Sequence, residues 1–149
     1  MKIFLCAILF LMFSACCLTG NKCEDDHTMI DFKIVDSKTA VDLVFGPSSI
    51  YNADSIQFFS VSGHDTTYHY YYAELSSNLG TDSLLFVNVN VENNAPVFMR
   101  LNDSDIDTLR FTYVMNDGGK CCGDSKSLKT FQHNNNSVKT INGLSTIQK

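Results

Sequence analysis

The sequence predicts an all-β fold, an antiparallel β-sandwich that follows an N-terminal signal helix and a flexible tether. Apolar and polar side chains alternate with a period of two along several short segments, which is typical of half-buried strands. Clusters of Asn, Asp, Gly and Ser separate these segments, as turns separate strands. Phe and Tyr, which favour strands, are plentiful. An immunoglobulin-like strand order is the default for this pattern, although Trp, a hallmark of those domains, is absent.

Residues 3–13 form an unbroken apolar run, IFLCAILFLMF, directly after the basic residue Lys2. A basic start, an apolar stretch of about 7–15 residues and then small residues are the pattern of a secretory signal. A helix that spans a bilayer needs about 20 apolar residues, and this run is shorter. A cleaved signal is therefore favoured, and a permanent membrane span is the alternative. We therefore expect residues 1–15 to be a signal peptide.

Residues 13–16, FSAC, resemble the lipobox of bacterial lipoproteins, in the form that signals of Bacteroidota lipoproteins often have. KTAVDLVFGPSSIY at residues 38–51, together with DTLRFTY…CCG…F, resembles small envelope lipoproteins of Bacteroidota. The lipobox resemblance implies cleavage by signal peptidase II and attachment of a diacylglycerol, with acyl chains such as palmitate, to Cys16. It also implies a lipid-anchored location in the bacterial cell envelope, at the periplasmic or surface face of the outer membrane. Two or three acyl chains hold a protein stably at a bilayer, whereas one does not. The alternative is a soluble secreted protein that is cleaved a few residues later.

Four further cysteines remain once Cys6 is removed with the signal peptide and Cys16 carries the lipid. Disulfides are expected outside the cytosol, and four cysteines allow three pairings. Two pairings join the polar tether, residues 16–28, to the Gly-rich loop GGKCCG at residues 118–123. The third is a vicinal disulfide within that loop, which could also act as a redox pair. The candidate residues are Cys17, Cys23, Cys121 and Cys122.

The predicted sandwich domain occupies residues 29–149. Residues 29–35, MIDFKIV, alternate apolar and polar side chains and predict the first strand. Residues 38–51 contain Gly46 and Pro47, which interrupt strands, so they predict a loop across the end of the sandwich. The segments DSIQFFSV and TYHYYYAEL flank the turn SGHD and predict a hairpin.

The second half of the domain continues the alternation. LLFVNVNV at residues 84–91 and VFMRL at residues 97–101 are separated by the strand breaker ENNAP. TLRFTYVM at residues 108–115 places Leu109, Phe111, Tyr113 and Met115 on one face. SLKTFQH and VKTIN flank NNNS and predict a final hairpin.

Charge and motifs limit the classes of function. The formal net charge of the chain is −5, and its Lys and Arg residues are scattered singly, so we expect no nucleic acid partner. Neither the G-x-S-x-G nor the H-E-x-x-H motif occurs. We therefore expect no enzymatic activity. The alternative is a small hydrolase or metal-dependent enzyme that uses His64, Asp65 and His69, or the acidic loop at residues 103–107.

Asp103, Asp105 and Asp107 form a D-x-D-x-D run on a predicted loop. Alternate carboxylates can converge on a hard cation such as Ca²⁺. An EF-hand loop, however, needs Gly at its sixth position and Glu at its twelfth, which here are Thr108 and Val114. We therefore expect a solvated acidic turn and no cofactor, with a Ca²⁺ site as the alternative.

Four tyrosines are concentrated at residues 68–72. A strand directs Tyr68, Tyr70 and Tyr72 to one face and His69 and Tyr71 to the other. If the first three face solvent, they form a platform that can stack on a sugar ring or on an apolar surface of another envelope protein. The alternative is that one face belongs to the core.

Four triplets resemble the D-S/T-apolar acceptor of protein O-glycosylation in Bacteroidota. Asp followed by Ser or Thr is also ordinary turn chemistry, and each triplet precedes a predicted strand. The resemblance implies acceptor hydroxyls on Ser55, Thr66, Ser83 and Thr108.

Overall fold

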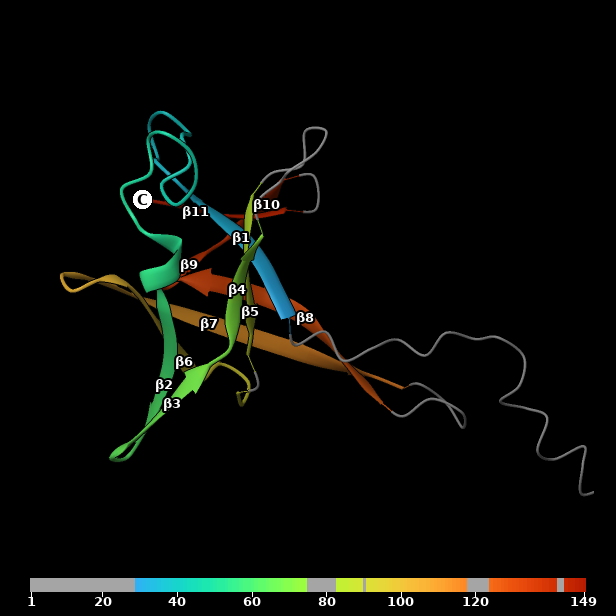
Figure 1. Ribbon diagram of the computed structural model, residues 1–149. Helices are drawn as coiled ribbons and strands as arrows, with labels where there is room; N and C mark the ends of the chain where they lie inside the picture. The colour runs from blue at the N-terminus through green and yellow to red at the C-terminus, as the bar shows by residue number, and fades with distance from the viewer. Residues whose placement is uncertain (1–28, 75–82, 90, 118–123, 142–143) are drawn as a thin grey trace, which may run out of the picture.

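The computed structural model describes residues 29–74, 83–89, 91–117, 124–141 and 144–149 (Figure 1). Two sheets, both dominated by antiparallel pairs, pack together as a sandwich, so the predicted all-β sandwich is confirmed. The signal peptide at residues 1–15, the tether at residues 16–28 and the loop at residues 118–123 lie outside the described residues. The same holds for Cys16 and for the four disulfide candidates, Cys17, Cys23, Cys121 and Cys122.

The two sheets contain five and six of the described strands. In order across the five-stranded sheet they are β10 (Lys139–Ile141), β11 (Leu144–Gln148), β1 (Met29–Val35), β5 (Leu84–Asn88) and β4 (Tyr71–Glu74). The six-stranded sheet runs β3 (Asp65–His69), β2 (Gln57–Ser62), β6 (Pro96–Asn102), β7 (Asp105–Asn116), β8 (Ser125–His133) and β9 (Asn136–Ser137).

Only β1 and β11 are parallel among these described pairs. Three consecutive strands, β6, β7 and β8, lie side by side as a meander. This order differs from the ABED and CFG sheets of an immunoglobulin constant domain, so the immunoglobulin-like order is not confirmed.

Alternation along the strands builds the core, as predicted. Strand β1 coincides with its predicted bounds, and its side chains Ile30, Phe32 and Ile34 are buried. Inward residues of β5, β6 and β7 are buried in the same way, and the partly buried Tyr113 packs against them. Met115 is an exception, because it is 56% exposed. The β7–β8 register shifts just before it, between Thr112 and Tyr113, and Figure 1 shows the ends of both strands extending beyond the five-stranded sheet.

Aromatic side chains join the two sheets at the centre. Phe32 of β1 lies edge-on to Phe58 of β2 and to Phe131 of β8, with ring centroids 6.1 Å and 5.6 Å apart. Phe131 in turn stacks on Phe111 of β7 at 4.9 Å. Because Phe32 is completely buried, this cluster holds the sheets together by apolar burial and ring contacts.

Two segments pass from one sheet to the other at the sides of the sandwich. The predicted strand at residues 67–75 divides at Tyr70, with β3 in the six-stranded sheet and β4 in the five-stranded sheet (Figure 1). On the opposite side the chain changes sheets at Val138, between β9 and β10. The predicted hairpin between SLKTFQH and VKTIN is confirmed only at its start, where β8 pairs with β9 and the Val138 N–H donates to the Phe131 carbonyl oxygen at 2.9 Å. It is wrong for residues 139–141, which pair with β11, a strand that the sequence analysis missed. Such corners let one continuous segment serve two sheets.

The predicted loop at residues 38–51 closes one end of the sandwich. Its Leu43, Val44 and Tyr51 side chains are buried against the core. The Asp42 carboxylate accepts hydrogen bonds from the backbone N–H groups of Val44 and Phe45, both at 2.8 Å, and so fixes the turn. A short 3₁₀ turn, η2 (Ala53–Ser55), then leads into β2.

Candidate functional site

Three exposed tyrosines follow one another around the corner between β3 and β4. Tyr68 is 65% exposed, Tyr70 is 68% exposed and Tyr72 is 37% exposed. Tyr71, which lies between two of them, points inward, where its ring lies 5.3 Å from Phe58 and its hydroxyl donates to the carbonyl oxygen of Ala53 at 3.0 Å. Because the alternation continues through the corner, all three exposed rings point away from the core. We call Tyr68, Tyr70 and Tyr72 the tyrosine ridge.

Neighbouring aromatic rings support both ends of the tyrosine ridge. Tyr72 stacks on Phe86 of β5, with centroids 4.7 Å apart and planes within 4°. Tyr70 lies 6.3 Å from Tyr72. Contacts of this kind limit the rotation of the rings, which lowers the entropic cost of binding a ligand against them.

At the other end of the tyrosine ridge, Tyr68 lies 6.0 Å from Phe59 of β2. Phe59 stacks on Phe98 of β6 at 5.4 Å, and the Arg100 guanidinium lies 5.5 Å from the Phe59 centroid. The sequence analysis missed these supporting residues and Phe86. The alternation along each strand could have indicated them, because each lies on the strand face opposite to the buried residues.

The candidate catalytic residues His64, Asp65 and His69 are not brought together. His64 and Asp65 are exposed at the β2–β3 turn, whereas His69 lies at the other end of β3, four residues after Asp65, a separation of about 13 Å in an extended strand. The His69 Nε2 atom is 3.2 Å from the Ser60 hydroxyl oxygen. Burial lowers the pKa of His69. Of the two histidines in the predicted hairpin, His64 is thus exposed, whereas the side chain of His69 is half-buried.

The acidic run also differs from its prediction. Asp103 is exposed in the β6–β7 turn, but Asp105 and Asp107 belong to β7 rather than to a loop. Their side chains point to the inner face, in phase with the buried Leu109. Both converge on the ammonium group of Lys149, whose Nζ lies 2.5 Å from Asp105 Oδ1 and 2.7 Å from Asp107 Oδ2. The expected solvated acidic turn is therefore wrong for Asp105 and Asp107, and the ammonium group of Lys149 lies between the two carboxylates, where the alternative placed Ca²⁺.

Asp107 has further partners around its buried carboxylate, which is 6% exposed. His133 Nε2 lies 3.1 Å from Asp107 Oδ2, and the Asn134 side-chain amide donates to Oδ1 at 2.7 Å. Burial alone would raise the pKa of Asp107, but the hydrogen bonds from His133, Lys149 and Asn134 outweigh it and hold the pKa well below its usual value. The carboxylate is therefore held in its ionised form.

Tyr51 and Lys149 complete this group. The Tyr51 hydroxyl donates to Asp105 Oδ2 at 2.5 Å, and burial and this hydrogen bond raise the Tyr51 pKa. Burial would lower the pKa of Lys149, but its hydrogen bonds to Asp105 and Asp107 outweigh burial and raise it. We call these residues, namely Tyr51, Asp105, Asp107, His133, Asn134 and Lys149, the ionic cluster. It joins β7, the β8–β9 turn, the end of β11 and the loop after β1.

The ionic cluster is a closed arrangement within the described part of the chain. No buried side-chain nitrogen or oxygen there lacks a hydrogen-bond partner. No group of three or more His, Cys, Asp or Glu residues in these ranges could hold a metal ion. The arrangement therefore stabilises the end of the sandwich and presents no free titratable group to a ligand.

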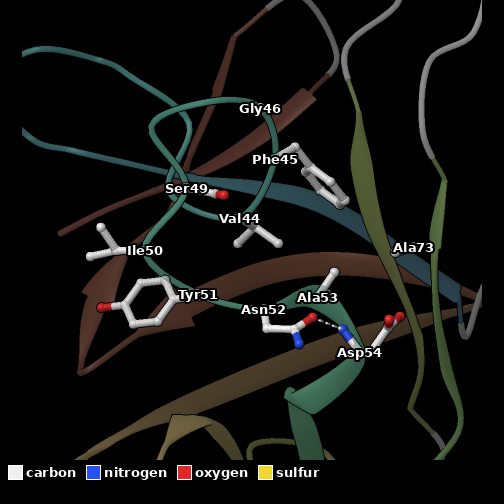
Figure 2. Close-up of a pocket in the computed structure, with 10 residues that line it drawn as sticks. All are labelled: Val44, Phe45, Gly46, Ser49, Ile50, Tyr51, Asn52, Ala53, Asp54 and Ala73. Carbon is white, nitrogen blue, oxygen red and sulfur yellow. Dashed lines mark hydrogen bonds between the residues drawn. The ribbon is translucent and has the colours of Figure 1, made fainter.

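An open hollow of about 570 Å³ lies beside the loop that precedes β2 (Figure 2). Its walls include Val44, Phe45 and Ile50 of the loop and Ala73 of β4. The Asp54 backbone N–H donates to the Asn52 side-chain oxygen at 3.0 Å on one side. The wall thus combines apolar side chains with the polar residues of the 3₁₀ turn.

The four hydroxyls that resemble glycosylation acceptors differ in exposure. Ser55 and Thr66 are exposed, whereas Ser83 and Thr108 are half-buried. The Ser55 hydroxyl donates to the carbonyl oxygen of Asn52 at 2.9 Å. Ser55 and Thr66 are therefore the acceptors that an enzyme could reach without local unfolding.

Comparison of the chain with protein-family models, with curated proteins and with solved structures gave no match. Within the described residues, no helix has the length and apolar character needed to cross a membrane.

Proposed function

We propose that the protein is a lipoprotein of the bacterial cell envelope, anchored through Cys16, whose sandwich is a binding module that contacts its ligand through the tyrosine ridge. The lipobox-like FSAC after an apolar run supports the anchor. The observation that carries the binding role is the exposure of Tyr68 and Tyr70, 65% and 68%, on a surface whose neighbouring rings are held by stacking.

A sugar ring is the ligand that we propose for this surface. Tyrosine offers an apolar ring face together with a hydroxyl that hydrogen-bonds, which suits the apolar and polar faces of a pyranose. The alternative ligand is an apolar patch on another envelope protein. A binding role is favoured over catalysis because the titratable groups of the ionic cluster are bonded to one another. Tyr51 is the member that also lines the open hollow, and its hydroxyl already donates to Asp105.

Replacing Tyr70 with Ala is expected to weaken glycan binding at least tenfold while leaving the melting temperature unchanged. The reason is that Tyr70 is 68% exposed and carries none of the core packing. The measurement is binding of the purified protein to an array of envelope and host glycans, followed by titration of the best glycan.

Ile50→Ala is the matched control, because Ile50 is an equally exposed apolar residue, at 67%, outside the tyrosine ridge. It is expected to bind the glycan as the unmodified protein does. Silence of the array would count against a sugar ligand, and equal losses for both variants would indicate non-specific contact.

A further inference from the structure

The two sides of the sandwich differ in how well their edge strands are protected against the addition of a further strand. On one side of the sandwich, the edge strand β9 has two residues, and β10 has three residues and carries Lys139. Short strands and lysines are the usual protections of a sheet edge. On the other side, β3 has five residues and β4 has four, and the segment from residue 65 to residue 74, DTTYHYYYAE, contains neither Lys nor Pro. This tyrosine-rich edge is therefore the one suited to receive a further strand.

The register of β4 identifies which backbone groups face that edge. The Asn88 N–H donates to the Tyr70 carbonyl oxygen at 2.9 Å, and Tyr72 lies opposite Phe86 in the β4–β5 ladder. Because hydrogen-bonded positions alternate in an antiparallel ladder, Tyr70, Tyr72 and Glu74 bond to β5. The N–H and C=O groups of Tyr71 and Ala73 consequently point away from β5, toward the edge of the described sheet.

We infer that the β4 edge binds a second copy of this chain, with β4 antiparallel to β4 across a two-fold axis at Tyr72. In this register Tyr71 of each copy exchanges hydrogen bonds with Ala73 of the other. It is the only two-fold register in which the open positions of β4 satisfy one another. An axis at Tyr71 leaves Ala73 opposite a residue outside β4, and an axis at Ala73 leaves Tyr71 opposite such a residue.

Side chains on both faces are compatible with this axis. On the outer face Tyr72 meets Tyr72 of the second copy, so the Tyr72–Phe86 stacks of the two copies form one row of four rings. On the inner face the small Ala73 lies beside the large Tyr71. Glu74 lies opposite Tyr70 rather than opposite a second Glu74, which avoids facing carboxylates on an acidic chain.

The contact is limited in length, because the chain leaves the five-stranded sheet at Tyr70. One short strand from each copy buries less than the roughly 800 Å² per partner of a stable complex. The pair is therefore expected to form reversibly, with a sedimentation coefficient that rises with protein concentration. The inference goes beyond the proposed ligand, since the paired strands extend the aromatic surface without covering its outer face.

The register is tested with Tyr72→Cys in the full-length protein under a mild oxidant. The two-fold axis brings the two introduced thiols to opposite, non-hydrogen-bonded positions with Cα atoms about 4.5 Å apart, which a disulfide can bridge. We expect a covalent dimer, with the cross-linked peptide identified by mass spectrometry to separate it from products of the native cysteines. Tyr70→Cys is the matched control and is expected not to cross-link, because its two copies lie about 13 Å apart along the strand.

A second variant tests the backbone hydrogen bonds. Ala73→Pro removes an N–H that points to the edge and leaves the β4–β5 bonds in place, and it is expected to remain monomeric at concentrations where the unmodified chain and Ala73→Val dimerise. Absence of a Tyr72→Cys cross-link, equal cross-linking at Tyr70, or a concentration-independent monomer would overturn the inference and assign the edge to another occupant. None of these results depends on glycan binding, so they leave the proposed function to its own test.

Discussion

Replacing Lys149 with Met is expected to lower the free energy of unfolding by about 3 kcal/mol, because two carboxylates then share the inner face of β7 without a cation. Lys149 Nζ contacts Asp105 and Asp107 directly, and Asp107 is almost fully buried. Met keeps the length and the apolar stem of the side chain, so the loss isolates the charge. The measurement is urea unfolding at pH 7, compared with Lys139→Met, which removes an exposed lysine and is expected to change stability by less than about 0.5 kcal/mol.

The pH dependence of this loss identifies its cause. The folded-state pKa of Asp107 lies below its unfolded value, so the stabilisation it supplies is complete above about pH 4 and is lost as the pH falls further. The Lys149 pKa is raised, so its contribution persists at neutral pH and disappears only as the pH rises through the folded value. The difference between Lys149→Met and the unmodified protein should therefore shrink below pH 4. A difference that stays constant with pH would show that lost packing, not lost charge, is responsible.

Replacing Phe32 with Ala is expected to lower the free energy of unfolding by about 3–5 kcal/mol. The Phe32 ring is completely buried and touches Phe58 and Phe131 of the opposite sheet, so its removal leaves a cavity at the junction of the sheets. Denaturant unfolding of the two variants and of the unmodified protein measures the loss. Phe32→Leu retains most of the volume and is expected to cost less than half as much. Equal costs for the two variants would mean that the ring contacts, rather than the filled volume, hold the sheets together.

The strands of this fold could be predicted where local alternation decides burial. Ile30, Phe32 and Ile34 alternate with polar residues, and β1 begins and ends where that pattern does. The tyrosine alternation at residues 68–72 was also readable, because side chains of a strand alternate whichever sheet the strand joins. The passage of the chain from one sheet to the other at Tyr70 and at Val138 could not be predicted from the sequence. Pairing partners are set by contacts between distant segments, which periodicity does not record.

The ionic cluster shows the same limit. Asp105 and Asp107 are separated by more than 40 residues from Lys149, their cation, so nothing local indicates the pairing. A signal for their burial was nevertheless present. Asp107 stands two residues before Leu109, so extending the predicted strand backwards places its carboxylate on the core side. An inward carboxylate needs a cation or hydrogen-bond donors, and that requirement would have directed the search to distant Lys, His and Asn residues.

The tyrosine ridge and the ionic cluster lie on the same scaffold but differ in what their side chains contact. The ionic cluster fastens the loop, β7 and β11 at one end of the sandwich through bonds among its own members. The tyrosine ridge is flanked by Phe59 and Phe86 of the neighbouring strands, and Tyr68 and Tyr70 are largely exposed to solvent. Variants of the ionic cluster should therefore change stability, and variants of the tyrosine ridge should change the proposed binding.

The proposed attachment of a diacylglycerol to the sulfur of Cys16 is the premise from which the proposed compartment and membrane anchor follow. The decisive comparison is fractionation of cells that produce either the unmodified chain or Cys16→Ser, combined with intact mass of each product. We predict that the unmodified protein sediments with membranes and has the mass of the chain from Cys16 plus lipid, while Cys16→Ser loses both properties. Membrane association and a processed mass that are identical for the two chains would contradict the proposal.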